Sequence, residues 1–443
     1  MKKALSLVLA LVMLLALMSG CGSSGTAEQK PAAAPAAPVN DAPAAEPAEA
    51  PADAPDAGEP AAEGEKVLRF GMVCDFASPF GLDAVNGMQA WCEYKNAQGG
   101  IPVGDDMYLL EGIFYDTTGD QVTANTAVER LIFEDKVDYI VSDNSMVDSW
   151  LHIAEENQTV ALISTNSTVC FNPDWHYIYE TGTKNCSTAS YTQWLVNHVD
   201  FESAALVHPD SSTGEIDANA IRDMILLFKP DAKVELISYP GDSSDLSSTG
   251  TRIAASNPDF VMSVGGGPIL DCQVISVAKQ AGYAGQLALS GTITYGQQLE
   301  FVGAENAEGL ISGANPVEFD PGLTEFSEEF RQAYIAKFGE WNDPEVACSH
   351  AFYALVYAVQ EAGSVDKEAV CEVLSNGLEY EGPLGHSIMV SRPDQGNDRT
   401  VDSVAGFIVK QIVDGERVIP QDGEISLETA VGAFNIYLDS LAG

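Results

Sequence analysis

Cysteine and histidine have the widest chemistry of any side chains, and this 443-residue chain holds eight cysteines and six histidines. No Cys-x-x-Cys pair occurs, and no cysteines or histidines stand at the spacing of a zinc site. Apart from Cys21 the cysteines number seven, so they cannot all be paired. We therefore expect buried free thiols rather than a disulfide framework. They are Cys74, Cys92, Cys170, Cys186, Cys272, Cys348 and Cys371.

Sequence signatures of familiar catalytic machinery do not occur either. The chain contains no HExxH, no GxSxG and no P-loop motif. Gly265-Gly266-Gly267 follows an apolar run, but it lacks the rest of a dinucleotide fingerprint. Glu345 and His350 stand where alanines recur at helical spacing, which favours a packed helix histidine with satisfied hydrogen bonds. We predict no catalytic site, no metal and no cofactor.

The apolar pattern predicts the elements that carry these residues. After Lys66, short apolar runs alternate with stretches of helical periodicity. Strands are predicted at 67–73, 108–115, 137–141, 160–164, 177–179, 204–208, 234–239 and 260–264. Helices are predicted at 187–199, 216–228, 246–256 and 271–281. This alternation is typical of an α/β fold with parallel sheets, in which ligands bind at the carboxyl ends of the strands. Because about 380 residues exceed one such sheet, we predict two lobes with a cleft between them.

The N-terminus resembles an export signal. Two lysines precede an apolar run at 4–18, which has the length of a signal-peptide core and is short for a membrane span of about 20 residues. The run ends in Leu17-Met18-Ser19-Gly20-Cys21, which resembles a bacterial lipobox with Met18 in the place of the usual leucine. The resemblance implies a signal peptide at 1–20 and lipidation of Cys21, whose acyl chains would hold the protein on a membrane. An ordinary cleaved signal peptide and an uncleaved anchor are the alternatives.

The next segment, 21–65, has the composition of a spacer. It consists largely of alanine and proline with scattered acidic residues, so it offers little to bury. Proline-rich segments of this kind are extended and semi-rigid. We therefore predict a linker that holds the folded part away from a surface.

The charge of the chain limits its partners. With 65 acidic and 21 basic residues, the formal net charge is −44, and most of the acidic residues lie beyond residue 65. A polyanion of this kind is repelled by nucleic acid and by anionic lipid. Hydrophobic residues make up 46% of the chain, enough for a folded core. We expect an acidic folded protein that binds no nucleic acid.

Several segments taken together resemble one family. Asn96-Ala97-Gln98-Gly99-Gly100-Ile101, followed by a strand that ends at Asp116, is similar to the "NAxGGI … D" opening of type I periplasmic solute-binding proteins of the branched-chain amino acid (Leu/Ile/Val) family. Further matching segments follow in the same order at 136–141, 161–168, 257–260, 265–267, 306–310 and 334–339. The resemblance covers about 67–414. It implies two Rossmann-like lobes joined by three hinge strands, which close on a ligand. Lobe 1 would comprise 66–182 plus 314–386, and lobe 2 would comprise 183–313 plus 387–443.

The resemblance also implies a ligand site in lobe 1. In the family, the loops after two strands hold the ligand carboxylate with hydroxyl groups and helix N-termini. The matching positions are Asp143-Asn144-Ser145 and Asn166-Ser167-Thr168. Serine and threonine at such positions are equally typical of helix N-caps. Asp143 is awkward for an anion and could instead face a cationic group.

Lobe 2 departs from the family pattern. Thr213-Gly214 stands where many members have an aromatic residue before glycine. Pro268-Ile269 stands where amino-acid binders have an acidic residue that holds the ammonium group. Asp271, Asp75 or Glu180 could take its place. An α-amino acid is therefore one possible ligand, and an apolar or aromatic carboxylate or an amide is another.

Aromatic residues could line the site. Phe80 lies in the first loop, where the family places a residue over the ligand, which makes it the best candidate. Phe76, Trp175 and Tyr177 could do the same, although buried aromatic residues are more often part of a core.

The predicted function is that of an extracytoplasmic substrate-binding component of an ABC importer. It would be a monomer, anchored by lipid to the cell membrane, that delivers a small solute to ABC permease subunits. The solute would be an amino acid or a related carboxylate or amide. A ligand-binding sensor that feeds a signalling partner is the alternative, and a hydrolase is a third possibility.

Overall fold

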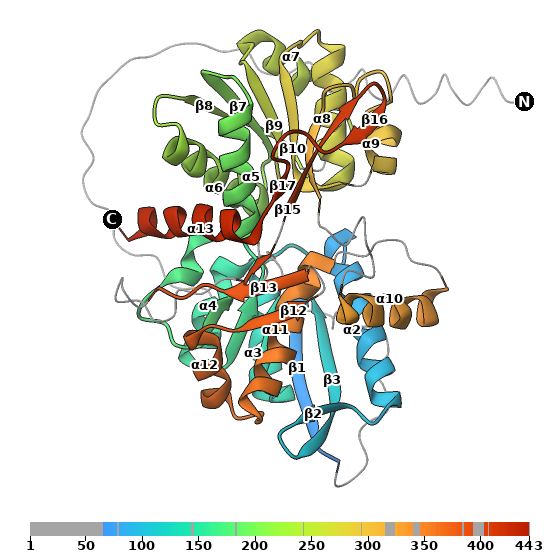
Figure 1. Ribbon diagram of the computed structural model, residues 1–443, viewed down its shortest axis with the longest axis vertical. Coiled ribbons are helices and arrows are strands. Elements are labelled where there is room, and N and C mark those ends of the chain that lie inside the picture. The colour runs from blue at the N-terminus through green and yellow to red at the C-terminus, as the bar shows by residue number, and fades with distance from the viewer. Residues whose placement is uncertain are drawn as a thin grey trace, which may run out of the picture. The chain divides into compact units, whose positions relative to one another are not determined.

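The structure is a computed structural model, and it describes most of the chain after residue 64 (Figure 1). The described residues are 65–77, 79–142, 146–181, 184–241, 243–293, 295–314, 324–339, 346–382, 385–392, 403–405 and 407–442. The predicted signal peptide, Cys21 and the predicted linker therefore lie outside the described residues.

A six-stranded sheet forms the first lobe, in the order β2-β3-β1-β4-β5-β6. Its strands are β1 Val67–Cys74, β2 Ile101–Val103, β3 Asp106–Asp116, β4 Tyr139–Ser142, β5 Val160–Ile163 and β6 Ile178–Glu180. The edge strand β2 is antiparallel to β3, and the other neighbours are parallel. β4, β5 and β6 are buried along their whole length, which is typical of parallel strands covered on both faces.

Helices from two parts of the chain cover this sheet. The first set is α2 Pro79–Ala97, α3 Gln121–Arg130 with a π-helical continuation at Leu131–Asp135, α4 Val147–Glu156 and the 3₁₀ turn η2 Thr168–Phe171. The second set is α10 Glu325–Phe338, α11 Val346–Ala362 and α12 Lys367–Asn376. α10 and α11 both pack on α2, where Trp91 stacks on Phe326 and meets Phe352 edge to face. Residues more than 200 positions apart in the chain thus share one core.

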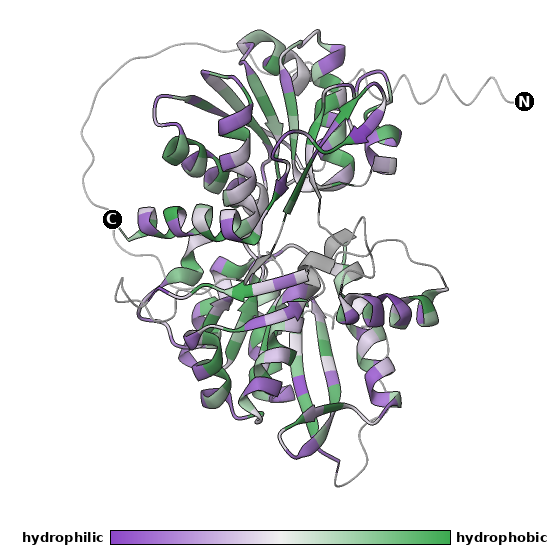
Figure 2. Cartoon of the chain, viewed as in Figure 1, coloured by the Kyte–Doolittle hydropathy of each residue, from purple (hydrophilic) through white to green (hydrophobic). Residues whose placement is uncertain are grey.

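The second lobe is built on another sheet, in the order β16-β15-β11-β10-β9-β7-β8, with β17 paired to β15. Its strands are β7 Ser203–Pro209, β8 Lys233–Tyr239, β9 Phe260–Ser263, β10 Gln286–Thr292, β11 Ile311–Ala314, β15 Phe407–Val413, β16 Glu416–Val418 and β17 Glu424–Ile425. Its helices are α5 Lys184–His198, α6 Ser212–Phe228, α7 Ser247–Ser256, α8 Gly267–Gln280, α9 Tyr295–Phe301 and α13 Leu427–Leu441. Figure 2 shows hydrophobic residues along the central strands of both sheets.

The predicted α/β fold is confirmed, and its parallel sheets each carry antiparallel strands at an edge. In the second lobe, β7 to β11 pair in parallel, but β15 is antiparallel to β11, β16 and β17. β15 and β16 form a hairpin whose turn, Asp414-Gly415, has positive φ angles of 53° and 74° at its two residues. Such a two-residue turn joins antiparallel strands directly, whereas parallel strands need a long crossover.

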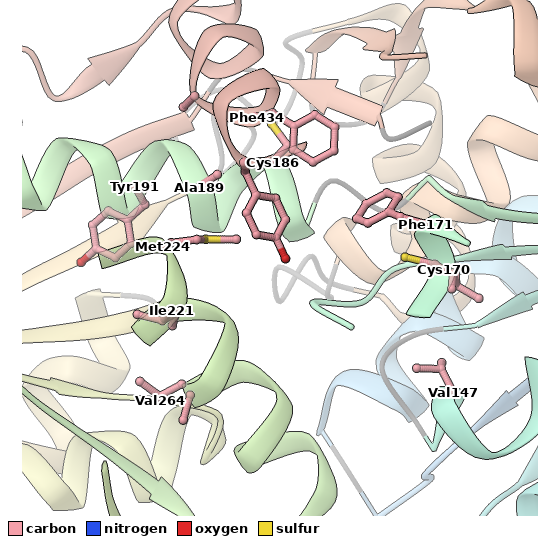
Figure 3. Close-up of a cluster of buried hydrophobic side chains, with 14 of the residues drawn as sticks. Val147, Cys170, Phe171, Cys186, Ala189, Tyr191, Ile221, Met224, Val264 and Phe434 are labelled. Atoms are coloured by element: carbon pink, nitrogen blue, oxygen red, sulfur yellow. The ribbon is translucent and has the colours of Figure 1, made fainter. Parts of the chain in front are cut away.

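A small third sheet and three crossings connect the elements. β12 Glu379–Gly382, β13 Gly385–Met389 and β14 Ser403–Ala405 form an antiparallel sheet. The chain leaves the first large sheet after β6, leaves the second after β11 for α10 to α12 and the small sheet, and returns to the second at β15. One hydrophobic cluster is continuous across the two lobes, and Phe171 of η2 lies 6.0 Å from Phe434 of α13 between ring centroids (Figure 3).

Six of the seven cysteines predicted to be free thiols are buried in the described ranges, and no disulfide joins any two of them, in agreement with the prediction. They are Cys74, Cys92, Cys170, Cys186, Cys272 and Cys371. Within the described ranges, no helix is both long enough and apolar enough to cross a bilayer. The same ranges contain no group of three or more His, Cys, Asp or Glu side chains placed to hold a metal ion.

Candidate functional site

Buried polar side chains gather where β5 and β6 end. Seven residues there, which we call the polar cluster, expose less than a tenth of their surface. They are Ser164, Thr165, Asn166, Ser167, Glu180, Thr181 and Asn185. Polar side chains are rarely buried unless they are hydrogen-bonded or serve a site. The carboxyl ends of parallel strands are also where α/β proteins bind their ligands.

Glu180 and Asn185 both bind the backbone of Thr165. The Thr165 N–H donates to Glu180 Oε2 at 2.7 Å, and Asn185 Nδ2 donates to the Thr165 carbonyl at 3.0 Å. The other end of the Asn185 amide, Oδ1, is buried without a hydrogen-bond partner, and so is the Thr181 hydroxyl. A buried polar group left in this state costs about 1–3 kcal/mol. The polar cluster therefore retains unused hydrogen-bonding capacity.

Asn166 links the two lobes. Its Nδ2 donates to Asp217 Oδ1 on α6 at 2.9 Å, and its Oδ1 accepts from the Thr188 hydroxyl on α5 at 3.0 Å. Asp217 in turn lies close to Gly265, since a Cβ placed on that glycine would be 3.5 Å from Asp217 Oδ2. The loop after β5 of one sheet thus reaches the loop after β9 of the other through one side-chain pair.

Ser167 and Thr168, predicted to contact the ligand, have different environments. Ser167 is the N-cap of η2 and accepts a hydrogen bond from the Val169 N–H at 3.3 Å. Its hydroxyl donates to the carboxylate of Asp148 on α4. The Ser167 proton is therefore directed at a carboxylate of this chain, while Thr168 is exposed at the start of η2.

Several predicted site residues are only partly placed. Asp143, Asn144 and Ser145 lie outside the described residues. Phe80 belongs to the first turn of α2, but its side chain is outside the described part. Thr213 lies half-buried in the first turn of α6, whose N-cap is Ser211.

Asp271, predicted as a possible partner of an ammonium group, holds a loop of its own lobe. Its buried carboxylate accepts from the Ser263 hydroxyl at 2.7 Å and from the Gly266 N–H at 3.1 Å. A Cβ on Gly266 would lie 2.4 Å from the Tyr239 hydroxyl and 2.8 Å from Asp271 Oδ1, so the loop closes only around glycine. The sequence shows Asp271 and the glycines before it, but it does not show that the Asp271 carboxylate binds the Gly266 N–H.

Burial raises the pKa of Asp271 to about 7, and the negative charge of Asp217 raises it further, while the hydrogen bonds from Ser263 and the loop lower it. The folded protein therefore holds a proton between pH 4 and 7 that the unfolded chain has released. Because the unfolded chain ionises this group while the folded protein does not, stability falls as the pH rises through this range.

We expect Asp271→Asn to remove this pH dependence. Relative to the variant, the wild type should lose about 4 kcal/mol of unfolding free energy at most between pH 4 and 8. Urea denaturation of both proteins across this range measures the difference. A difference that stays constant with pH would contradict the assignment.

The sequence missed Thr181, Asn185, Thr188 and Asp217. Each lies in or next to a segment that the apolar pattern predicted, but nothing in residue type marks it as part of a site. Asn185 lies at the start of α5, and its hydrogen bond to the Thr165 carbonyl joins residues 20 positions apart in the chain. A search for polar residues directly after buried strands would have found Thr181 alone.

One family model matches the chain, and solved structures share its fold. Residues 67–404 match a family model described as periplasmic binding protein. A leucine-binding protein from Thermotoga maritima superposes with a TM-score of 0.63 at 17% identity, covering 81% of this chain and 99% of that one. A solute-binding protein of an ABC transporter from R. palustris, solved with benzoate, gives 0.61 at 16% identity over 80% and 95%. An ABC transporter substrate-binding protein from Sphaerobacter thermophilus gives 0.61 at 18% identity over 82% and 100%. No curated protein matches the chain.

Proposed function

Because the chain belongs to the periplasmic binding protein family, whose model matches residues 67–404, we propose that it captures a small solute for an ABC importer. The observation that carries this proposal is the polar cluster at the ends of β5 and β6, joined to the second lobe by the Asn166–Asp217 hydrogen bond. A solute held there would touch both lobes. Contacts with both lobes favour the closed arrangement, which a permease can distinguish from the open one.

Two solved relatives indicate the size of solute to test. One is described as a leucine-binding protein, and the other was solved with benzoate. Leucine and benzoate are both small molecules with an apolar part. For this chain we propose a solute of similar size, bound between lobe 1 (66–182 plus 314–386) and lobe 2 (183–313 plus 387–443). Phe80 and the residues 143–145 and 167–168 remain proposed contacts, and Thr213 is a further one on lobe 2.

The remaining parts of the proposal concern location. A signal peptide at 1–20 would direct export, lipidated Cys21 would anchor the mature protein in the membrane, and 21–65 would act as the spacer. The acidic folded part would work as a monomer on the extracytoplasmic face, beside its permease subunits. The high negative charge would favour solubility there.

Ligand binding tests the proposal directly. We expect one member of a library of amino acids, amines, amides and small carboxylates to raise the melting temperature and to bind with 1:1 stoichiometry in calorimetry. Small-angle X-ray scattering should show a lower radius of gyration at saturation, because closure brings the lobes together. The solute should be recovered unchanged after prolonged incubation. If no compound of a broad library stabilises the protein, solute capture is the wrong function.

A further inference from the structure

Three donors of the polar cluster are aimed at carboxylates of the chain itself. The Thr165 N–H donates to Glu180, the Ser167 hydroxyl to Asp148, and Asn166 Nδ2 to Asp217. A solute carboxylate at this place would need these donors and would meet three negative charges instead. A solute carboxylate within hydrogen-bonding reach of these groups would be repelled strongly by the chain's own carboxylates, because the site is partly buried.

The unused capacity of the cluster is that of an acceptor. Asn185 is fully buried, and its Nδ2 is fixed on the Thr165 carbonyl, so its Oδ1 is the end that has no partner. An amide oxygen only accepts hydrogen bonds, so the group that satisfies it must carry N–H or O–H. The Thr181 hydroxyl, next in the chain to Glu180, is also without a partner and can accept as well.

Resting on the proposed function, we propose that the solute binds through a cationic head group with N–H donors, such as an ammonium or an amidinium. Its N–H groups donate to Asn185 Oδ1 and Thr181 Oγ1, and its charge is balanced by Glu180 and Asp217. A hydrogen bond to an ionised group is roughly twice as strong as a neutral one, so a small cation can be held firmly there.

Two basic residues must be considered. Lys184 begins α5 close to the cluster in sequence, and its side chain lies outside the described part. Arg417 of β16 donates to the carbonyls of Ile293 and Gly313, beside the ends of β10 and β11 in the second lobe. The Arg417 side chain therefore forms these hydrogen bonds away from the ends of β5 and β6. An anionic part of the solute would fit better near Arg417 than at the polar cluster.

Matched pairs of probes with the same shape and opposite charge test the proposal. Benzamidine and benzoate form one pair, and n-butylamine and butyrate form the other. In calorimetry at pH 7.5 and low salt, we expect each cation to bind at least 10-fold more tightly than its carboxylate partner. Raising the salt to 0.5 M should weaken cation binding, because screening reduces the attraction.

Variants identify the place of binding. Glu180→Gln keeps the shape and an acceptor for the Thr165 N–H, and it should weaken binding of the cation at least 10-fold. Asp217→Asn, which lies on the other lobe, should do the same and covers the case in which Glu180→Gln fails to fold. Glu305→Gln removes the same charge from an exposed turn and should leave affinity unchanged.

The outcomes separate the two proposals. Binding of a carboxylate in preference to its cationic partner, or cation binding that neither Glu180→Gln nor Asp217→Asn weakens, overturns the cationic head group and leaves solute capture standing. Absence of any binding, in these pairs and in the broad library, overturns both.

Discussion

Replacing Gly100 by alanine is expected to destabilise the first lobe by about 4 kcal/mol or more. Gly100 has a φ of +93°, a conformation that costs an L-residue about 1–2 kcal/mol. A Cβ there would also lie 2.0 Å from the backbone carbonyl oxygen of Tyr108 on β3. Backbone cannot move aside without disturbing the pairing of β2 with β3, so the clash adds to the strain.

The adjacent glycine is a matched control. Gly99 has a φ of +99°, but a Cβ there would meet no atom within 4 Å. Gly99→Ala should therefore cost only about 1–2 kcal/mol, the conformational part alone. Urea denaturation followed by circular dichroism measures both variants. Equal losses for the two would show that the approach to Tyr108 does not matter.

Acid is expected to destabilise the protein through His350. This histidine is fully buried on α11, with its Nε2 2.6 Å from the Tyr380 hydroxyl and its Nδ1 without a partner. Burial lowers the pKa of His350 from its usual 6.5 to about 3. The unfolded chain takes up a proton as the pH falls below 6.5, whereas the folded protein does not. Stability is therefore full above pH 6.5 and is lost as the pH falls towards 3.

The loss can be measured against a variant. Between pH 7.5 and pH 5, the wild type should lose about 2 kcal/mol more unfolding free energy than His350→Gln, which cannot be protonated. Tyr380→Phe removes the hydrogen bond but keeps His350 buried, so the acid step should persist in it. Loss of the acid step in Tyr380→Phe would mean that the hydrogen bond, rather than burial, lowers this pKa.

The sequence predicted the elements well because each has a strong local signal. The strands predicted at 67–73 and 204–208 are observed at Val67–Cys74 and Ser203–Pro209. The helix predicted at 216–228 is observed at Ser212–Phe228. Buried parallel strands are continuous apolar runs, so their presence does not depend on distant residues. No strand was predicted after residue 264, so β10, β11 and the antiparallel strand β15 were missed.

The motif that first indicated the family proves to be structural. Asn96 donates to the carbonyl of Leu110 and accepts from its N–H, both at 2.9 Å, which fastens the end of α2 to β3. Gly99 and Gly100 then allow the tight reversal into β2. Such a motif identifies a fold without identifying a ligand.

The site was predicted less completely than the fold. Position after a strand drew attention to Ser167 and Glu180, which are both buried, but it could not show that the Ser167 proton is directed at Asp148. Nor could it show that Asp271 turns towards its own glycine loop. Both contacts depend on how loops from separate segments meet, and local residue patterns carry no information about that.

The buried cysteines can report how readily each lobe opens. Cys74, Cys92 and Cys371 belong to a hydrophobic core of the first lobe. Cys272 belongs to a hydrophobic core of the second lobe. Burial raises the pKa of Cys92 and that of Cys272, so these thiols resist alkylating reagents until their surroundings come apart. The rate at which each cysteine is labelled under native conditions then reports the free energy of opening around it. The native protein thus carries probes in both halves, and no residue has to be changed to compare the stability of one with that of the other.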